Sequence, residues 1–317
     1  MFEILIPTYK RNKNLKRLLK ILNKNIIFSK DKILIRIVDN DDTNHFDCSR
    51  FKNLKIIYKK NKKNIGGRGS SRVLLKKFTK SKSSKYALFI SDDDIPHNFK
   101  NLLVIIKKIL ISKKIDFLQI NSILKDKKKF KSFTLSPALK IYKESHFIDK
   151  CTVFTGVFVS KNLAKKFLMY QKKFVFTKSL AYPTQLLLML SNQNFFIIKP
   201  FFIHTINNKV YWNYKDIRYS FWIQRILFYH FFYKQSKNLS KKKICYSLLK
   251  MFICRNYNAL NIYKKELEHF KDLPFSIEEI NSNNLLDVKI KHIFFSTLQK
   301  FLKIFEKMYI FIYLRNN

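Results

Sequence analysis

The first hundred residues alternate short apolar runs with segments whose apolar positions recur at helical spacing. In residues 15–22, leucines recur three or four positions apart, which predicts a helix with one buried face. Short apolar runs bounded by polar residues predict strands. This alternation favours an α/β fold with a mixed, mostly parallel sheet flanked by helices. The predicted strands are residues 2–6, 33–38, 54–58 and 86–90, and the later helices include residues 73–78 and 99–110.

The middle and the end of the chain show a weaker pattern. After Pro200 the sequence becomes crowded with aromatic and basic residues, and residues 290–313 carry apolar positions on one helical stripe. We therefore predict an α/β domain over residues 1–204 and a helical extension over residues 205–317. Further strands are predicted at residues 117–121, 153–160 and 195–198, with a helix at 186–190.

Polar side chains follow each of the four strands predicted in the first hundred residues. The carboxyl ends of parallel strands meet at one edge of the sheet, where open α/β sheets bind their ligands. We therefore expect one site formed by all four segments. In chain order, the polar residues are Thr8, Tyr9 and Arg11, then Asp39, Asp41 and Asp42, then residues 64–72, and finally Asp92, Asp93 and Asp94.

Three consecutive aspartates, Asp92 to Asp94, occur in a chain whose formal net charge is +43. Adjacent carboxylates repel one another unless a cation or hydrogen-bond donors offset their charge. Carboxylate oxygens are the ligands that Mg2+ and Mn2+ prefer, and a diphosphate usually completes such a site. Capping of a helix that starts near Pro96 is the alternative, but it accounts for one or two aspartates rather than three.

Three of the four glycines in the chain, Gly66, Gly67 and Gly69, cluster in the sequence "GGRGSSR". Such clustering in a glycine-poor chain indicates a tight bend or a close approach to a ligand. The segment is neither a P-loop nor a dinucleotide-binding fingerprint. Two arginines within it, Arg68 and Arg72, are able to contact phosphate.

The charge balance and the cysteines limit the partners and the compartment. With 64 lysines and arginines against 21 acidic residues, the protein should be attracted to polyanions, such as nucleic acid or an anionic membrane surface. The lysines are spread along the whole chain and the expected rim is acidic, which argues against specific nucleic-acid binding. None of the four cysteines has metal-ligand spacing, and no signal peptide or long apolar run is visible, so we expect a cytoplasmic protein.

Four segments, "ILIPTYKRNKNLKRLL", "IRIVDND", "NIGGRGSSR" and "LFISDDDIP", occur in the order and spacing of the family-two nucleotide-sugar glycosyltransferases. The chain resembles that family over residues 1–110 and loosely over residues 150–200. The resemblance implies a GT-A fold, a nucleoside-diphosphate sugar donor, favoured as a UDP type, a Mn2+ or Mg2+ ion, and inversion at the anomeric carbon. The residues that it places around the nucleotide are Pro7, Thr8, Tyr9, Arg11, Asp39 at the base, Asn64, Gly66, Gly67 and Arg72.

The acidic triplet matches the family's Asp-x-Asp element in one of two registers. In the first, Asp92 and Asp94 hold the metal while Asp93 contacts the ribose. In the second, Asp93 and Asp94 are the paired acids, and Ser91 stands where another aspartate is common.

The general base is not apparent at the position where the family usually carries an acid. The matching stretch, "SLAYPTQLLLML", has no carboxylate. Three residues are candidates for deprotonating the acceptor hydroxyl: Asp149, Asp216 and His204. Asp149 is slightly favoured because it precedes the predicted strand "VFTGVF". For Asp216, the alternative is an ion pair with a neighbouring lysine or arginine. For His204, the alternatives are a place in the core or a role as a metal ligand. It is also open whether a base is needed at all.

The resemblance thus implies a metal-dependent, inverting glycosyltransferase, which we expect to act in bacterial surface polysaccharide synthesis on a glycan or lipid-linked acceptor. The aromatic and basic extension either packs on the α/β domain or contacts the inner face of an anionic cytoplasmic membrane, through residues such as Trp212, Trp222, Phe231 and Phe232. The alternatives are a nucleic-acid-binding protein and a nucleotidyltransferase. The latter usually has a glycine-rich turn after its first strand, where this chain has "PTYKRN".

Overall fold

The computed structural model describes residues 2–26, 33–41, 43, 45–112, 115–124, 135–137, 155–171, 181–192, 194–204 and 229–255. The chain divides into two compact units, Met1–Gln224 and Arg225–Asn317. The predicted domain boundary at residue 204 adjoins residues 205–228, which lie outside the described part, so that boundary stays a prediction.

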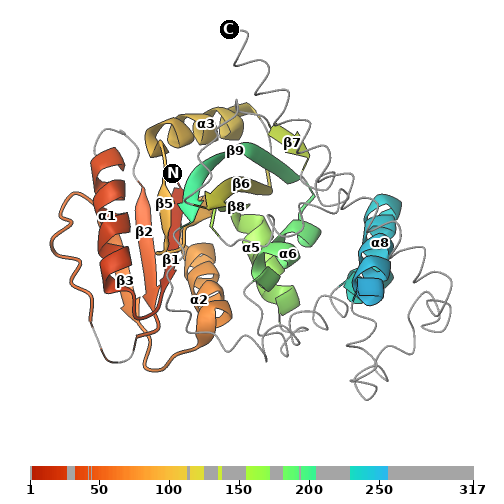
Figure 1. Ribbon diagram of the computed structural model, residues 1–317, viewed down its shortest axis with the longest axis horizontal. Coiled ribbons are helices and arrows are strands. Elements are labelled where there is room, and N and C mark those ends of the chain that lie inside the picture. Colours follow the sequence, from red (N-terminus) through yellow and green to blue (C-terminus); the bar gives the residue numbers. More distant parts are fainter. Residues whose placement is uncertain are drawn as a thin grey trace, which may run out of the picture. The chain divides into compact units, whose positions relative to one another are not determined.

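The first unit is built on a mixed, curled sheet (Figure 1). Its strand order is β3-β2-β1-β4-β8-β6-β9-β5, with β7 paired to β9. The pairs β3-β2, β2-β1, β1-β4 and β6-β9 are parallel, whereas β8 runs antiparallel to β4 and β6. The strands are β1 (Phe2–Thr8), β2 (Leu34–Asp39), β3 (Lys55–Lys60), β4 (Tyr86–Phe89), β5 (Asp94–Pro96), β6 (Phe117–Leu124), β7 (Leu135–Pro137), β8 (Val157–Ser160) and β9 (Asn194–His204).

Helices cover both faces of this sheet. The chain crosses it from β1 to β2 in one direction and from β3 to β4 in the other, so right-handed crossovers put the connecting helices on opposite faces. Helices α1 (Asn12–Ile26) and α3 (Phe99–Ser112) pack together on one face. Helices α2 (Gly66–Lys80), α5 (Lys161–Gln171) and α6 (Ala181–Leu190) pack together on the other. The second unit contains α8 (Leu239–Arg255). The fold class and the parallel pairing of the first four predicted strands are therefore as the alternating pattern predicts.

The core forms because the central strands are apolar on both faces. Ile4 and Ile6 of β1 pack with Leu15 and Leu22 of α1 in one cluster, while Leu5, on the opposite face of β1, is also fully buried. A strand covered by helices on both sides reads as a continuous apolar run, as β1 does. This packing fixes the strand ends, and so the loops that follow them, in place.

Two prolines mark places where the observed elements differ from the predicted ones: Pro96 was expected at a helix start, and Pro200 lies beyond the predicted strand 195–198. Pro96, expected in the first turn of a helix, lies in β5, and α3 starts only at Phe99 after a left-handed Asn98 with φ 53°. β5 ends the strand order, and an edge strand tolerates proline because one row of its N–H groups needs no partner. Pro200 does not end β9, which continues to His204, because it sits at an irregularity in the pairing with β6.

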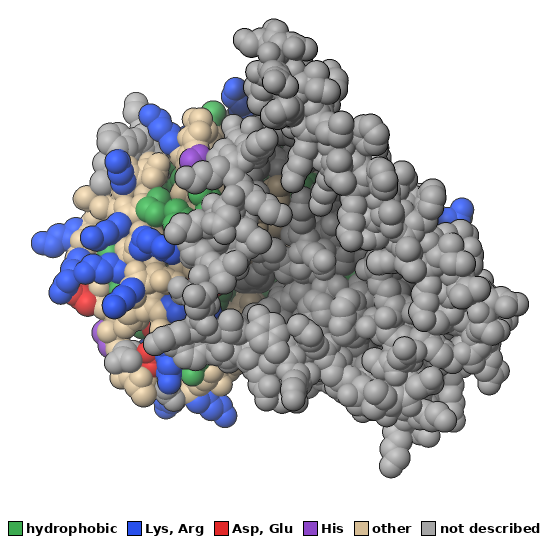
Figure 2. Space-filling view, in the orientation of Figure 1, with side chains coloured by type: hydrophobic (Ala, Val, Ile, Leu, Met, Phe, Trp, Pro, Cys, Tyr) green, Lys and Arg blue, Asp and Glu red, His purple; other side chains and the backbone are tan. Residues whose placement is uncertain are grey.

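Two further observations concern the predicted membrane contact. Among the described residues, no helix combines the length and the hydropathy needed to cross a membrane. Of the aromatic residues proposed to meet a membrane surface, Trp212 and Trp222 lie outside the described residues, and Phe232 is buried. On the face seen in Figure 2, lysine and arginine side chains are spread over the described surface, and acidic side chains are few.

Candidate functional site

The candidate site lies where the parallel strands end at one edge of the sheet. Thr8 is the register partner of Asp39, and Asp39 is the register partner of Lys60, so the last residues of β1, β2 and β3 lie level with one another. β4 pairs with the other side of β1, and its continuation is held by a hydrogen bond from the Ile90 N–H to the Leu5 carbonyl. The acidic triplet therefore emerges beside the segment that follows β1.

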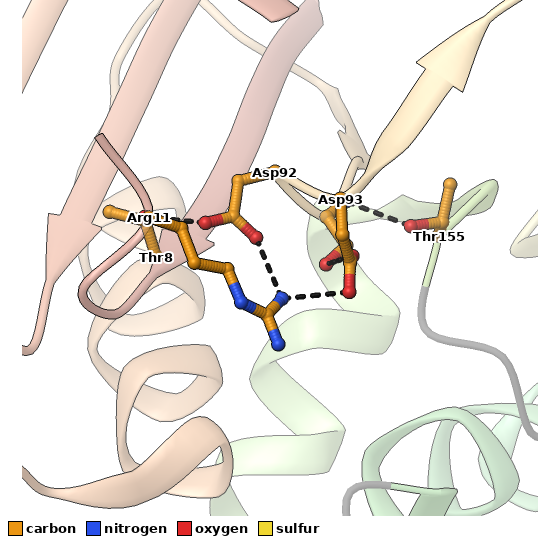
Figure 3. Close-up of polar contacts among 6 residues, drawn as sticks. Thr8, Arg11, Asp92, Asp93 and Thr155 are labelled. Carbon is orange, nitrogen blue, oxygen red and sulfur yellow. Dashed lines mark hydrogen bonds and ion pairs between the residues drawn. The ribbon is translucent and has the colours of Figure 1, made fainter. Parts of the chain in front are cut away.

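The acidic triplet is bound directly to that segment (Figure 3). The Thr8 hydroxyl donates to Asp92 Oδ2 at 2.6 Å. Arg11 Nη1 donates both to Asp92 Oδ1 at 3.2 Å and to Asp93 Oδ2 at 2.7 Å. Between them, Lys10 adopts a left-handed conformation, with φ 54°, which is uncommon outside glycine. One guanidinium nitrogen thus bridges two of the three carboxylates.

A tight turn presents these carboxylates. The Asp94 N–H donates to the Ser91 carbonyl at 3.2 Å, which closes a four-residue turn of the kind that aspartate favours. The Ser91 hydroxyl donates to Asp93 Oδ1, and the Ser91 N–H donates to the Thr155 hydroxyl at 2.8 Å. Figure 3 shows Thr155 approaching the turn from the opposite side to Arg11. The turn is therefore fixed from two sides by segments far apart in the sequence.

Helix capping does not account for the triplet. Asp94 belongs to β5, and α3 begins five residues later, at Phe99. The three carboxylates instead lie in one turn, where Arg11 contacts Asp92 and Asp93, and two of them, Asp92 and Asp94, are almost fully buried. Burial raises the pKa of Asp92 to about 7, although the positive charge of Arg11 opposes the shift. Burial lowers the pKa of Arg11, but Asp92 and Asp93 more than compensate and raise it overall.

The donor chemistry of this turn fits a divalent cation. Arg11 supplies one positive charge to Asp92 and Asp93, and Asp94 follows them in the same turn, so the ionised cluster retains negative charge that a cation can neutralise. Within the part of the chain that the structure describes, no three His, Cys, Asp or Glu side chains form a ready-made metal cage. A Mg2+-type ion bound through substrate phosphates needs only one or two carboxylates, so a complete protein cage is not required.

A second polar cluster surrounds Asp39, the residue expected to contact the base. Its Oδ2 accepts a hydrogen bond from the Tyr58 hydroxyl at 2.6 Å, and its Oδ1 accepts one from the Asp41 N–H at 2.8 Å. The Tyr58 hydroxyl also accepts from the Phe46 N–H at 3.4 Å, and the His45 ring packs edge-on against the Tyr58 ring. Burial raises the pKa of Asp39, while the Tyr58 hydrogen bond acts in the opposite direction. The carboxylate is fixed in orientation and keeps lone pairs for further donors.

The glycine-rich segment, residues 66–72, forms about the first two turns of α2, whereas the sequence pattern predicted a loop there and a helix only from residue 73. Gly66, the first residue of the helix, has φ 69°, and its N–H donates to Asn64 Oδ1 at 2.8 Å. A Cβ at Gly69 would lie 2.8 Å from the Ile65 side chain, so this position is closed to larger residues by packing. Arg72 is exposed on the same helix. The glycines thus allow a bend into a helix whose first N–H groups lack intrahelical partners.

Asn40 links the segments on this rim, and sequence reasoning missed it. Its N–H donates to the Thr8 carbonyl at 3.0 Å, its Nδ2 donates to the Gly66 carbonyl at 3.2 Å, and its Oδ1 accepts from Asn61 Nδ2 at 2.8 Å. Tyr58 and Thr155 were missed as well. For Asn40, the available sequence signal was an amide directly after a buried strand, in "IVDND".

The structure brings together some of the predicted site residues and leaves others open. Thr8, Arg11, Asp92 and Asp93 are in direct contact. Pro7 and Tyr9 flank Thr8 and are partly buried. The assignment of each residue to base, ribose, phosphate or metal remains a prediction, as does the register of the triplet.

Of the three candidate bases, the structure describes the backbone of His204 only. Asp149 and Asp216 lie outside the described residues. The backbone of His204 ends β9 as the register partner of Asp94 in β5. The stretch "AYPTQLLLML" forms α6, where Thr184 is fully buried, and this helix contributes no carboxylate.

The architecture is that of the GT-A glycosyltransferase fold. The crystal structure of S. aureus TarS 1-349 matches with a TM-score of 0.59 at 17% sequence identity, over 81% of this chain and 72% of that chain. The same fragment in complex with UDP-GlcNAc matches with a TM-score of 0.59. The longer TarS structure gives a TM-score of 0.57 at 16% identity, over 90% of this chain and 50% of that chain.

At this level of identity the likeness shows the fold. No family model matches the chain, and a search of the curated proteins finds no match either.

Proposed function

We propose that the protein is a glycosyltransferase that moves a sugar from a nucleoside-diphosphate donor to a glycan or lipid-linked acceptor. The observation that carries this proposal is the contact between Arg11 and the carboxylates of Asp92 and Asp93, at the edge of a GT-A sheet. This contact links the acidic turn, whose carboxylates are suited to bind a cation, to the segment after β1. The oriented Asp39 carboxylate and the glycine-rich start of α2 lie on the same rim, which supports binding of a base and a diphosphate there.

A uridine-type donor is favoured. The TarS structures that share this fold include complexes with UDP and with UDP-GlcNAc. In this chain, Asp39 presents a fixed carboxylate whose remaining lone pairs suit a ring N–H such as the imino group of uracil. The identity of the sugar is left to experiment.

The proposal includes a divalent cation held by Asp94 together with Asp92 or Asp93. When bound, the ion would offset the charge that develops on the departing diphosphate. His204 is a candidate for a further ligand because its Cα is the register partner of Asp94 across β5 and β9. Directly opposed residues in antiparallel strands have Cα atoms about 4.5–5.5 Å apart, which is within ligand-sharing range. Arg11 holds Asp92 and Asp93 in place beside that position.

The acceptor is proposed to bind near β8, in the second half of the sheet. Thr155 and Gly156 connect the acidic turn to β8, and Asp149, the favoured general base, precedes them by a few positions in the sequence. A base there would deprotonate the acceptor hydroxyl for direct attack on the anomeric carbon, with inversion. We further propose action in bacterial surface polysaccharide synthesis at the inner face of the cytoplasmic membrane, where the basic protein would contact anionic lipid.

Donor hydrolysis provides the test. The purified protein is incubated with a panel of UDP-, GDP- and dTDP-sugars, with Mn2+ or with EDTA, and the released nucleoside diphosphate is measured. The proposal predicts release from at least one UDP-sugar in Mn2+ and little in EDTA. Cation-independent release, or binding of DNA without binding of any nucleotide in a parallel thermal-shift assay, would contradict it.

A further inference from the structure

Asn40 is almost fully buried and makes three hydrogen bonds to three different segments of the rim. Its backbone reaches the end of β1 at Thr8, and its side chain reaches both Gly66 at the start of α2 and Asn61 after β3. Asn61 in turn donates its own N–H to the Asp39 carbonyl at 2.8 Å. A buried amide with both ends occupied holds a unique orientation, because any other leaves a polar group without a partner.

The orientation of the Asn40 amide follows from its partners. A backbone carbonyl only accepts hydrogen bonds, so the end that faces the Gly66 oxygen must be the NH2 group. The other end is then the oxygen, and it accepts from Asn61 Nδ2. The two contacts are mutually consistent.

Fixing the Gly66 carbonyl also fixes the next amide. The peptide unit is planar and trans, so the Gly67 N–H points away from the Gly66 C=O. Gly66 has φ 69° and its own N–H is bound by Asn64, so the chain enters α2 through a bend that is held on both sides. Without a cradle, a glycine-rich turn samples many conformations, since glycine has no Cβ to limit it.

We propose that Asn40 is a positioning residue for donor binding. By holding the Gly66 carbonyl, it aims the Gly67 N–H and sets the affinity of the glycine-rich turn for the diphosphate of the donor. This inference rests on the proposed function. It assigns different roles to two parts of the rim. Tyr58 orients Asp39 for the base, whereas Asn40 orients the turn for the phosphates.

The test compares uridine with UDP in wild-type protein and in two near-isosteric variants. Asn40→Asp keeps the acceptor for Asn61 but replaces the donor to Gly66 with a second acceptor. It should weaken UDP about tenfold or more, in line with a lost, buried hydrogen bond, and should change the uridine dissociation constant by less than about twofold. Tyr58→Phe is the control, and it should weaken uridine and UDP by the same factor. A purely structural defect would not alter the ratio of the two constants. Asn40→Ala removes the same donor without adding a negative charge, and it should shift the ratio in the same direction, which distinguishes the lost hydrogen bond from charge repulsion between the Asn40→Asp carboxylate and the diphosphate.

Hydrogen exchange supplies a second readout that needs no ligand. The amides of residues 66–71 should exchange faster in Asn40→Asp and at the wild-type rate in Tyr58→Phe. If Asn40→Asp does not fold, Asn61→Ala, which removes the donor to Asn40 Oδ1, should show the same changes in smaller measure. Suppose that the wild-type protein binds UDP, but that Asn40→Asp changes neither the ratio of the UDP and uridine dissociation constants nor the amide exchange of residues 66–71. That result would overturn the inference and leave the proposed function standing. Failure of the wild-type protein to bind either ligand would overturn the proposed function and the inference together.

Discussion

Arg11 donates a hydrogen bond of 3.2 Å to Asp92, a carboxylate that is only 2% exposed, across a gap of 81 positions in the sequence. The same nitrogen atom reaches Asp93 at 2.7 Å. The positively charged Arg11 side chain therefore lies at the acidic turn, beside carboxylates that we propose to bind a metal ion.

Arg11→Ala leaves Asp92 buried without its positive partner. Breaking a buried ion pair in this way costs about 3–5 kcal/mol, and the lower end applies because Arg11 is one-fifth exposed. We expect a lower melting temperature, and a larger stabilisation by Mn2+ than in the wild-type protein, because the ion then supplies the missing charge. Differential scanning fluorimetry with and without Mn2+ measures both effects, with Lys13→Ala on the exposed face of α1 as the control. Equal Mn2+ shifts in Arg11→Ala and wild type would contradict the prediction.

Gly156 holds the junction between the acidic turn and β8, and it should not accept a side chain. Its φ is 81°, and a Cβ there would lie 2.4 Å from the Ile120 carbonyl oxygen. Gly156→Ala should therefore cost more than the roughly 1–2 kcal/mol of left-handed strain alone. Gly66→Ala is the matched control, because Gly66 has φ 69° but no heavy atom within 4 Å of the added Cβ. Urea unfolding of both variants compares the costs, and equal losses would remove the steric argument.

The stability of the protein should depend on pH through Asp39. Its folded-state pKa is raised by burial above the ordinary 3.8, so the folded protein holds this proton more tightly than the unfolded chain. The corresponding stability is fully present below about pH 3.8 and is lost as the pH rises through the folded pKa. Relative to wild type, Asp39→Asn should therefore gain free energy of unfolding as the pH rises from 4. Chemical denaturation across this range tests the trend, and a pH-independent difference would refute it.

Substitution of the general base should lower turnover without weakening the binding of the donor. Asp149→Asn is expected to lower transfer strongly, by about 100-fold or more, while leaving UDP affinity within about twofold of wild type. Asp216→Asn and His204→Gln are measured beside it. If His204 instead binds the cation, His204→Gln should weaken Mn2+-dependent UDP binding. Unchanged turnover in Asp149→Asn would remove that residue from the role.

The convergence of the strand ends was predictable because parallel strands place their carboxyl ends on one edge. That reasoning placed Thr8, Arg11 and Asp92 in one neighbourhood, and the structure shows that they are in direct contact. The position of Pro96 was not predictable in the same way. Its strand, β5, forms only because β9 lies beside it, and β9 comes about a hundred positions later in the chain. Local propensity carries no information about such a partner.

Asn40 and Tyr58 illustrate a second limit. Each acts through hydrogen bonds to segments on other strands, so its role depends on the register of β1, β2 and β3 rather than on its own neighbours in sequence. A polar residue after a buried strand is as compatible with an ordinary turn as with a link between loops. The general base is harder still, because Asp149 and Asp216 lie in stretches without a regular pattern.

Calorimetric titration of UDP, in Mn2+ and in EDTA, tests the central claim most directly when wild type is compared with Asp94→Asn. Asn has nearly the shape of Asp but is a much weaker ligand for a hard cation, and circular dichroism checks that the variant keeps its fold. The proposed site predicts that wild type binds UDP at least about tenfold more tightly in Mn2+ than in EDTA, and that Asp94→Asn loses this difference. Equal binding by wild type in both conditions, or a Mn2+ effect that survives in Asp94→Asn, would contradict the account.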